Sequence, residues 1–566
     1  MDAILKNKLT QAFAYQKDNQ LDKAITLYQK LHQDHPYEPQ ILNYLGVALA
    51  QAQHLEEAIT AFKKALKLDS NQPAVCNNLA NAYKQIHDYH EALIYYQRAL
   101  DLDDTALQAR HNLANLLSLE GRFAEAQTHY IKVIEQAPDF TLAHYHLGLL
   151  WFKQQRYLKA IDCFEYVIYQ HPEHLESLRH LGVLYLETNQ LNKAHECFAI
   201  LKKHAIELPD TLTNLGVIAL KQDMPQEAID YFTQALAEDN QHEKARHNLA
   251  ATFMHHDLFE NALMHYDVLL KHHPHNTEYL YNMGVAQMAL GHLNQAINLF
   301  KQLLIIKPAH FATLNNLAAV YIRLNKKTTA ATLLKQALQA NPDDKPSQHM
   351  LAAIEHPTKA TTCPEYARNL FDNYALYYDN HVQNYLNYTL PEQITALFND
   401  LVISPIETLL DAGCGTGLIG AHLRSLCRYL IGVDISPKML EHAKRKAIYD
   451  KLVTADIEVF LKNYKDALFD VIVAADVLPY LGDLALFFQG IKKTLKPEGY
   501  CILTTEISLQ ESWHLNATSR FSHNLEYLQD LCAFYQLDMV LHTKINARQQ
   551  EDTDVGMHLL VLRQNL

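Results

Sequence analysis

The chain has 566 residues, of which 49% are hydrophobic and 20% charged, a balance typical of a soluble globular protein and unlike that of a disordered chain. Lysine and arginine number 49 against 63 aspartates and glutamates, and this net charge of −14 argues against nucleic-acid binding through a general basic surface. No apolar stretch approaches the roughly 18 residues that a membrane span requires, so we expect no membrane-spanning segment.

The cysteines and the first residues bear on the location of the protein. The eight cysteines form no C-x-x-C pair and have apolar neighbours, which predicts buried free thiols rather than a disulfide framework. Met1–Gln16 lacks a basic start followed by an apolar core, so we predict no secretory signal and a cytoplasmic protein. The histidine runs at 255–256 and 272–275 lack cysteine or carboxylate at ligand spacing, so no metal site is expected.

A 34-residue repeat runs through the first part of the chain. Alanine recurs at this spacing from Ala24 to Ala330, a small residue stands twelve positions before each alanine, and a bulky ring stands four positions after it until Leu334 closes the series. The pattern predicts two antiparallel helices per cycle, in which the small residue lets the helices approach and the ring fills the gap. Because one such unit cannot bury its apolar face alone, the units are expected to stack into a superhelix. Ser347–Glu355 continues the phase and predicts a capping helix.

This repeat resembles the tetratricopeptide repeat (TPR) family over residues 5–342. The resemblance implies an all-α superhelix of about ten repeats plus the capping helix, which we assign to a first domain at 1–355.

One further position of the cycle carries polar side chains. Two residues before the small residue, from the third cycle onward, every side chain can donate and accept hydrogen bonds. In the TPR family this position faces the concave groove, and an asparagine ladder there resembles that of O-linked N-acetylglucosamine transferase, which implies a protein or peptide partner held by its backbone. The alternative is that these side chains bond neighbouring helices. The residues are Asn78, Asn112, His146, His180, Asn214, Asn248, Asn282 and Asn316.

The repeat phase ends at residues 356–364, where two prolines and small polar residues predict a linker before a second domain at 365–566. In that domain apolar strand-like runs alternate with helical segments, which predicts an α/β Rossmann-like fold with a parallel sheet and helices on both faces. Leu537–His542 and Met557–Leu562 follow one another with only a loop between them, so the sheet is expected to end in an antiparallel hairpin.

The first strand of this domain runs into a D-x-G-x-G-x-G motif that begins at Asp411. Its glycines let the backbone turn sharply and approach a ligand, although Gly415-x-Gly417-x-x-Gly420 also satisfies a dinucleotide-binding fingerprint. Asp411 occupies a place that dinucleotide folds normally keep apolar. Asp434 ends the next strand, where it can accept both ribose hydroxyls, and Asp456 follows the third, where an adenine amino group needs an acceptor.

Together with Phe469–Leu478 and Leu495–Tyr500, these motifs resemble class I S-adenosylmethionine (SAM) methyltransferases. The segment Phe371–Asp379 resembles the aromatic helix of ubiquinone- and biotin-pathway methyltransferases, whose rings help to close over the cofactor. The resemblance implies SAM as cofactor, and it places Asp476 where substrate meets the methyl group. The cofactor-binding residues that it implies are Phe371, Tyr378, Asp411, Gly413, Gly415, Gly417, Asp434, Asp456, Ile457 and Asp476.

The sequence contains no catalytic signature. Methyl transfer is an in-line displacement in which positioning alone can supply about 7–11 kcal/mol, so a dedicated base is optional. Weak candidates at strand ends or in the loops beyond them are Asp476, Tyr480, Glu506, His514 and His523.

Three functions are compatible with these motifs. The superhelix can recruit a protein that the second domain methylates, as in a bacterial family of TPR-containing methyltransferases, or the chain can be an adaptor whose methyltransferase fold has lost turnover. In the third, the acceptor is a small quinone-like or acyl metabolite. The acceptor atom, the partner and the oligomeric state are not specified by the sequence.

Overall fold

The structure is a computed structural model that describes residues 3–355, 361–375, 378–379, 382, 388–400, 406–550 and 553–565. The chain forms two compact units, Met1–His242 and Glu243–Leu566. Residues 356–360 of the predicted linker lie outside the described part. No helix in that part is long and apolar enough to cross a membrane.

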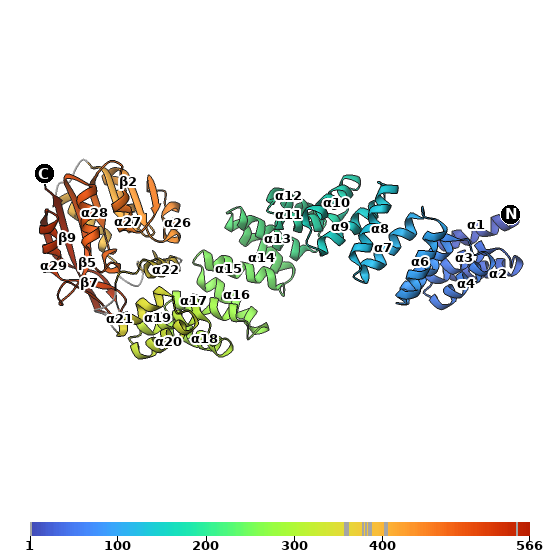
Figure 1. Cartoon of the computed structure of the whole chain (residues 1–566), viewed down its shortest axis with the longest axis horizontal. Helices are drawn as coiled ribbons and strands as arrows, with labels where there is room; N and C mark the ends of the chain where they lie inside the picture. Colours follow the sequence, from blue (N-terminus) through green and yellow to red (C-terminus); the bar gives the residue numbers. More distant parts are fainter. Residues whose placement is uncertain are drawn as a thin grey trace. The chain divides into compact units, whose positions relative to one another are not determined.

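The first unit consists of paired helices that follow the 34-residue period (Figure 1). Its helices are α1 (Ala3–Lys17), α2 (Leu21–Asp34), α3 (Pro39–Gln51), α4 (Leu55–Leu68), α5 (Pro73–Gln85), α6 (Tyr89–Leu102), α7 (Leu107–Leu119), α8 (Phe123–Gln136), α9 (Thr141–Lys153), α10 (Tyr157–Gln170), α11 (Leu175–Glu187), α12 (Leu191–Lys203), α13 (Leu208–Lys221) and α14 (Pro225–Glu238).

The second unit begins with the remaining repeats and ends with the α/β domain. The repeat helices are α15 (Glu243–His255), α16 (Phe259–His272), α17 (Thr277–Ala289), α18 (Leu293–Ile306), α19 (Phe311–Arg323), α20 (Lys327–Ala340) and the cap α21 (Lys345–Glu355). The predicted all-α repeat region with its capping helix is thereby confirmed.

Within the five hairpins that carry glycine, the small residue and the ring are in contact, as the sequence predicts. A Cβ atom added to Gly46 of α3 would lie 2.5 Å from the ring of Phe62 on α4, and one added to Gly182 of α11 would lie 2.8 Å from Phe198 on α12. The two partners also vary together. Glycine is paired with phenylalanine in five hairpins and alanine with tyrosine in four, so the space left by the small residue determines which ring fits.

We expect Gly46→Val to destabilise the first unit by about 1–3 kcal/mol, because the added methyl groups would overlap the buried Phe62 ring. The higher helix propensity of valine returns only a few tenths of a kcal/mol. Urea unfolding followed by far-ultraviolet circular dichroism measures the loss. Adding Phe62→Leu, which makes a small-residue–leucine pair like Ala318 and Leu334, should restore part of the stability. A single variant as stable as the parent would contradict the proposed close packing.

The α/β domain is built on a single sheet, which Figure 1 shows with its flanking helices. Strands β3, β2, β1, β4 and β5 lie side by side in this order and run parallel, with β9 antiparallel on the far edge of β5 and β8 antiparallel to β9. The predicted final hairpin is confirmed. The strands are β1 (Ile406–Ala412), β2 (Cys427–Asp434), β3 (Lys451–Thr454), β4 (Phe469–Ala474), β5 (Leu495–Ile507), β6 (Trp513–Leu515), β7 (Phe521–His523), β8 (Leu537–Gln550) and β9 (Thr553–Gln564).

Helices cover both faces of this sheet. Leu410 of β1 and Ile472 of β4 pack with Phe487, whereas the adjacent Leu409 and Val471 pack on the opposite face with Ile394, so side chains alternate as in a sheet buried on both sides. The helices and 3₁₀ turns of the domain are α22 (Pro364–Tyr374), α24 (Leu390–Asp400), α25 (Leu418–Leu423), η2 (Arg424–Leu426), α26 (Pro437–Arg445), α27 (Ile457–Asn463), η3 (Leu478–Tyr480), α28 (Ala485–Thr494) and α29 (Leu525–Phe534).

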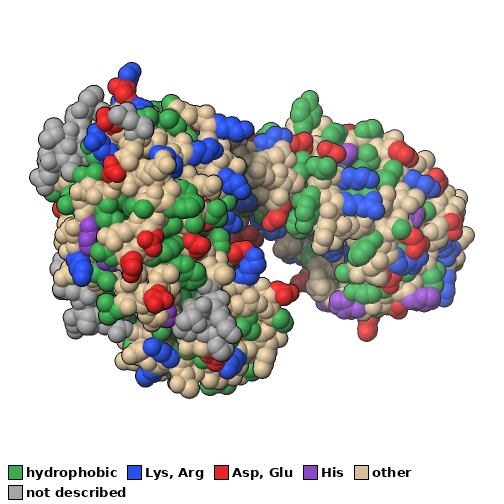
Figure 2. All heavy atoms as spheres, turned by 60° about the vertical axis from the view of Figure 1, so that its left-hand side comes forward, with side chains coloured by type: hydrophobic (Ala, Val, Ile, Leu, Met, Phe, Trp, Pro, Cys, Tyr) green, Lys and Arg blue, Asp and Glu red, His purple; other side chains and the backbone are tan. Residues whose placement is uncertain are grey.

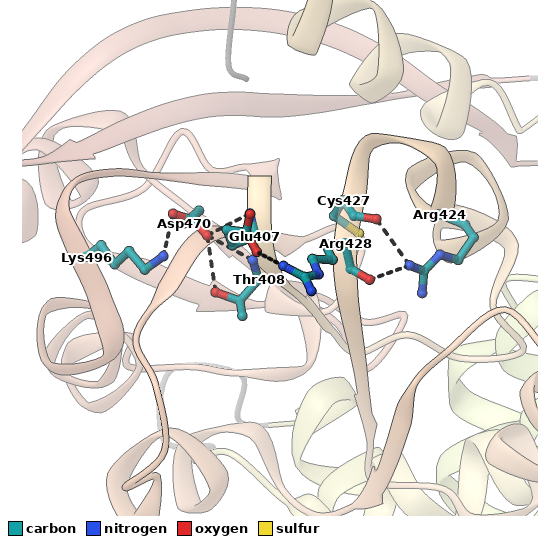
Figure 3. Close-up of polar contacts among 7 residues, drawn as sticks. All are labelled: Glu407, Thr408, Arg424, Cys427, Arg428, Asp470 and Lys496. Atoms are coloured by element: carbon teal, nitrogen blue, oxygen red, sulfur yellow. Dashed lines mark hydrogen bonds and ion pairs between the residues drawn. The ribbon is translucent and has the colours of Figure 1, made fainter. Parts of the chain in front are cut away.

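Polar contacts brace the amino ends of the strands, away from the glycine-rich loop (Figure 3). The carboxylate of Asp470 on β4 accepts hydrogen bonds from the backbone N–H groups of Glu407 and Thr408 on β1, at 3.0 and 2.8 Å, and pairs with Lys496 on β5 at 2.7 Å. Asp470 is therefore a structural residue that ties three strands together.

Elsewhere on the molecule, Figure 2 shows acidic and basic side chains interspersed over the visible face.

Candidate functional site

A pocket lies at the carboxyl ends of β1, β2, β3 and β4, where open α/β sheets bind ligands. Eight of the ten predicted cofactor residues line this pocket, and the other two, Asp411 and Gly417, do not. The lining consists of Thr362, Pro364, Ala367, Phe371, Tyr378, Gly413, Gly415, Val433, Asp434, Ile435, Met439, Ala455, Asp456, Ile457, Ala475, Asp476, Val477, Tyr480 and Leu481.

The glycine-rich loop and Asp434 form one wall of the pocket. Gly413 has φ +76° and a Cβ there would lie 2.6 Å from the Val477 side chain, so neither its conformation nor its surroundings admit another residue. The Asp434 carboxylate accepts hydrogen bonds from the N–H groups of Gly415 and Ser436, both at 2.8 Å. Burial raises the pKa of Asp434 to about 6, although these two N–H groups oppose the shift. One oxygen of Asp434 thus fixes the loop, and the other fixes the start of α26.

Asp411 and Gly417 differ from the other predicted residues because neither belongs to the pocket lining. Asp411 is 1% exposed and accepts a hydrogen bond of 2.6 Å from the Tyr449 hydroxyl. Burial raises its pKa to about 7; the bond from Tyr449 opposes the shift and nearby Asp434 adds to it. Gly417, with φ +89°, caps the start of α25. In this geometry Asp411 and Gly417 support the glycine-rich loop without lining the pocket.

Helix α22 brings Phe371 to the pocket, and Tyr378, which follows this helix in the chain, also lines it. Phe371 lies edge-on to the ring of Tyr480 at 4.8 Å between ring centroids, and to Tyr378 at 6.5 Å. Ser436 donates a hydrogen bond of 2.6 Å to Asp372, which fastens α22 to the loop after β2. Asp456 caps α27 by accepting from the N–H of Val459 at 3.1 Å, beside Ile457.

The far end of the pocket is charged. Asp476 has φ +56°, in the left-handed region that non-glycine residues adopt uncommonly. Arg520 forms ion pairs with Asp476 at 2.6 Å and with Glu506 at 2.7 Å, and it donates to the Tyr480 hydroxyl at 2.9 Å. All three charged side chains are only 11–12% exposed. Sequence reasoning missed Arg520, which lies in a turn without a motif.

The two candidate histidines are not part of the described pocket lining. The buried His523 contacts the Thr505 hydroxyl through Nδ1 and the carbonyl of Gly482 through Nε2 at 2.9 Å, so both ring nitrogens serve the fold. Burial lowers its pKa to about 4. His514 lies half-buried on β6, where its backbone pairs with Ser522.

The eight predicted groove residues are all half-buried. Asn78 donates to Asn43 and Asn112 to Asn77, both at 3.0 Å, and each acceptor belongs to the preceding repeat. Asn316 donates in the same way to the Tyr281 hydroxyl at 3.1 Å. Elsewhere in the series, Asn282 donates to the Tyr266 hydroxyl, His146 contacts His111 at 3.0 Å, and His180 stacks on Phe164. Several ladder side chains therefore already link adjacent hairpins.

Family models match both parts of the chain. A model described as "Methyltransferase domain" matches residues 410–503, which contain the glycine-rich loop, Asp434 and strands β2 to β4. Tetratricopeptide repeat models match residues 8–36, 48–86, 73–105, 111–174, 219–281 and 287–354. The chain is a tetratricopeptide-repeat protein that carries a methyltransferase domain.

Curated relatives of the methyltransferase domain cover a small part of the chain. A malonyl-[acyl-carrier protein] O-methyltransferase from Erwinia pyrifoliae is 32% identical over 105 residues, 18% of this chain and 39% of the relative. Nodulation protein S from Rhizobium tropici is 30% identical over 112 residues, 19% of this chain and 46% of the relative. The matches thus span less than half the length of these relatives. The solved structure of N-methyltransferase NodS from Bradyrhizobium japonicum, in complex with S-adenosyl-L-homocysteine, has 18% identity and a TM-score of 0.29, and it covers 35% of this chain and 98% of that one.

Proposed function

We propose that the protein is a SAM-dependent methyltransferase whose repeat region binds a protein that is the substrate or delivers it. The observation that carries the proposal is the pocket in which Asp434 and the bare backbone of Gly413 and Gly415 lie side by side, with Asp456 and Ile457 on one flank and Asp476 at the far end.

The residues of the pocket fit the proposed cofactor. Asp434 presents a buried carboxylate that can accept two ribose hydroxyls, and Asp456 can accept from an adenine amino group. Apolar side chains of Ile457 and Met439 line the same pocket and suit the faces of a purine. When bound, SAM supplies an electrophilic methyl group on a sulfonium.

The chain's own residues would act mainly by positioning. Phe371 and Tyr480 cover the pocket and exclude water, while Arg520 holds the carboxylate of Asp476 in a fixed orientation. Asp476 and Tyr480 line the pocket and are the residues best placed to contact an acceptor. Orientation of two reactants is a sufficient source of rate enhancement for an in-line methyl transfer.

The affinity for S-adenosylhomocysteine should fall as the pH is lowered through about 6. Burial raises the pKa of Asp434 to about 6. Ribose hydroxyls donate hydrogen bonds to the ionised carboxylate, so the ligand binds preferentially to the deprotonated form of Asp434. Affinity should be constant above pH 7 and about tenfold weaker at pH 5, by linkage. Calorimetry between pH 5 and 8 measures the profile, which Asp434→Asn should flatten. A flat profile in the parent protein would contradict ribose binding by Asp434.

The role proposed for the repeats rests on the polar ladder, which the resemblance to the TPR family places in the concave groove. The amides of Asn78 and Asn316 each donate one hydrogen bond to the preceding repeat, which leaves a second N–H and an acceptor oxygen for a peptide backbone. The Asn112 amide donates to both Asn77 and Asn81, and its oxygen accepts from Gln108. In this proposal Asn78 and Asn316 both link hairpins and contact an extended partner, and Asn112 contacts it through the second lone pair of its oxygen. The location proposed for this activity is the cytoplasm.

One labelling experiment separates the proposed function from two alternatives. The purified full chain is incubated with methyl-labelled SAM and a cell lysate, which is then fractionated, and Asp434→Ala serves as the control. Label in protein supports the proposal. Label in small molecules favours an acyl or quinone-like acceptor, as the name of the malonyl-[acyl-carrier protein] relative suggests. Cofactor binding without any label above the control would favour an adaptor.

A further inference from the structure

The β6–β7 hairpin lies directly over the charged end of the pocket. Residues 500–503 of β5 pair with both β4 and β9, so these two strands occupy opposite edges of β5. Glu506 pairs with Met557 of β9 and with Ser522 of β7, which places β7 on the same edge as β4. Because β4 ends at Ala474, the hairpin continues this edge just where Asp476 follows.

The turn of this hairpin directs Arg520 toward Asp476, which lines the pocket. Ser519 has φ +64° and its N–H donates to the carbonyl of Asn516 at 2.8 Å, while the N–H of Asn516 donates to the carbonyl of Arg520 at 2.7 Å. This tight turn sets the direction of the Arg520 side chain, whose guanidinium holds Asp476 and Glu506. A displacement of the turn would therefore move the cation that pairs with Asp476, which lines the pocket.

The outer side of the turn is held by α21, the last helix of the repeat region. His349 of α21 is 6% exposed, and its Nε2 lies 3.3 Å from the carbonyl oxygen of Ser519. Its ring packs against Tyr366 of α22 and Phe521 of β7, at centroid distances of 4.6 and 5.9 Å. Burial lowers the pKa of His349, although hydrogen bonds with the backbone of Ser519 and Thr361 oppose the shift, and Nε2 can donate to the Ser519 carbonyl.

Apolar contacts extend the attachment. Ala353 of α21 is 2% exposed and clusters with Leu515 and Phe521 of the hairpin, with Trp513 at the margin. A capping helix usually ends a repeat array with a polar outer face. Here the outer face of α21 is instead buried against the methyltransferase domain.

We propose that His349 is a positioning residue, through which the last repeat helix holds the Ser519 turn and thereby the Arg520–Asp476–Glu506 cluster. The assignment of this cluster to the acceptor side of the pocket rests on the proposed function. The repeat region then contributes to the geometry of the methyl-transfer site in addition to binding a partner.

The test uses Trp513 as a reporter of the hairpin. The chain has two tryptophans, so in a Trp151→Phe background the emission comes from Trp513, which packs edge-on to Phe521 at 5.6 Å. In the full chain, His349→Ala should raise the acrylamide quenching constant of Trp513 about twofold or more, because the loss of one hydrogen bond changes the population of the held turn severalfold. S-adenosylhomocysteine affinity should stay within about twofold of the parent, since His349 lies outside the cofactor-binding lining.

Two further variants keep the test decisive if His349→Ala does not fold. His349→Gln retains an N–H donor and should leave quenching at the parent value, whereas His349→Phe retains the ring without the donor and should raise it. His310→Ala, which removes a helix-capping histidine from α19, should leave Trp513 unchanged. Equal quenching in the glutamine and phenylalanine variants, or a parallel loss of S-adenosylhomocysteine affinity, would overturn the proposal. Failure of the parent chain to bind S-adenosylhomocysteine would refute the proposed function but leave the Trp513 comparison valid.

Discussion

Replacement of Asp434 by alanine should weaken the binding of SAM and S-adenosylhomocysteine at least about tenfold. A buried carboxylate that accepts two hydroxyl groups makes charge-assisted bonds of about 1.5–3 kcal/mol each, and each 1.4 kcal/mol corresponds to a factor of ten. The variant also loses the acceptor for the Gly415 N–H, which loosens the glycine-rich loop. Isothermal titration calorimetry on the full chain measures the change.

Asp466→Ala is a suitable control for the Asp434 variant. Asp466 is 69% exposed and pairs only distantly with Lys451, at 3.6 Å, so its removal changes the charge by the same amount without touching the pocket. Its affinity should match that of the parent. NADH should compete poorly with S-adenosylhomocysteine, and tight NADH binding would revive the dinucleotide interpretation of the loop. Unchanged affinity in Asp434→Ala would show that the cofactor site is elsewhere.

Arg520→Ala should cost about 3–5 kcal/mol of stability in the methyltransferase domain, because it leaves Asp476 and Glu506 buried without their shared cation. A chain with two compact units need not unfold in one step. Urea unfolding of the methyltransferase domain is therefore followed by the emission of Trp513 in the Trp151→Phe background. Trp513 belongs to the same hairpin as Arg520 and reports on its unfolding.

The cause of the Arg520 effect can be separated from loss of packing. Adding Asp476→Asn and Glu506→Gln to Arg520→Ala removes the two uncompensated charges and should recover much of the stability. Arg428→Ala breaks the exposed ion pair with Glu407 and should leave the midpoint of the unfolding transition unchanged. If the triple variant is no more stable than Arg520→Ala, buried charge is not the reason for the loss.

The sequence predicts those structural features that depend on neighbouring residues or on a repeated spacing. The 34-residue spacing predicts the paired helices because each cycle repeats the same contact, as between Gly46 and Phe62. The glycine-rich loop and Asp434 are also predictable, since both follow directly from strands whose carboxyl ends meet at one edge of the sheet. Their roles toward SAM remain predictions.

The sequence is less informative where distant segments meet. Arg520 is 44 residues from Asp476, in a turn between two three-residue strands that carry no motif. The packing of α21 on this hairpin depends on His349 and Ala353, which look like ordinary repeat residues in the sequence. The prolines near 356–364 predict a linker between two domains, and this boundary stays a prediction.

The matched pairs of small residue and ring limit how such an array can evolve or be engineered. A recombination break between the two helices of a hairpin would join the glycine of one repeat to the tyrosine of another, or an alanine to a phenylalanine. Breaks in the loops between hairpins keep each pair together. Repeats of this protein should therefore be exchanged or duplicated as whole hairpins, with the segment from Gly46 to Phe62 inherited as one block.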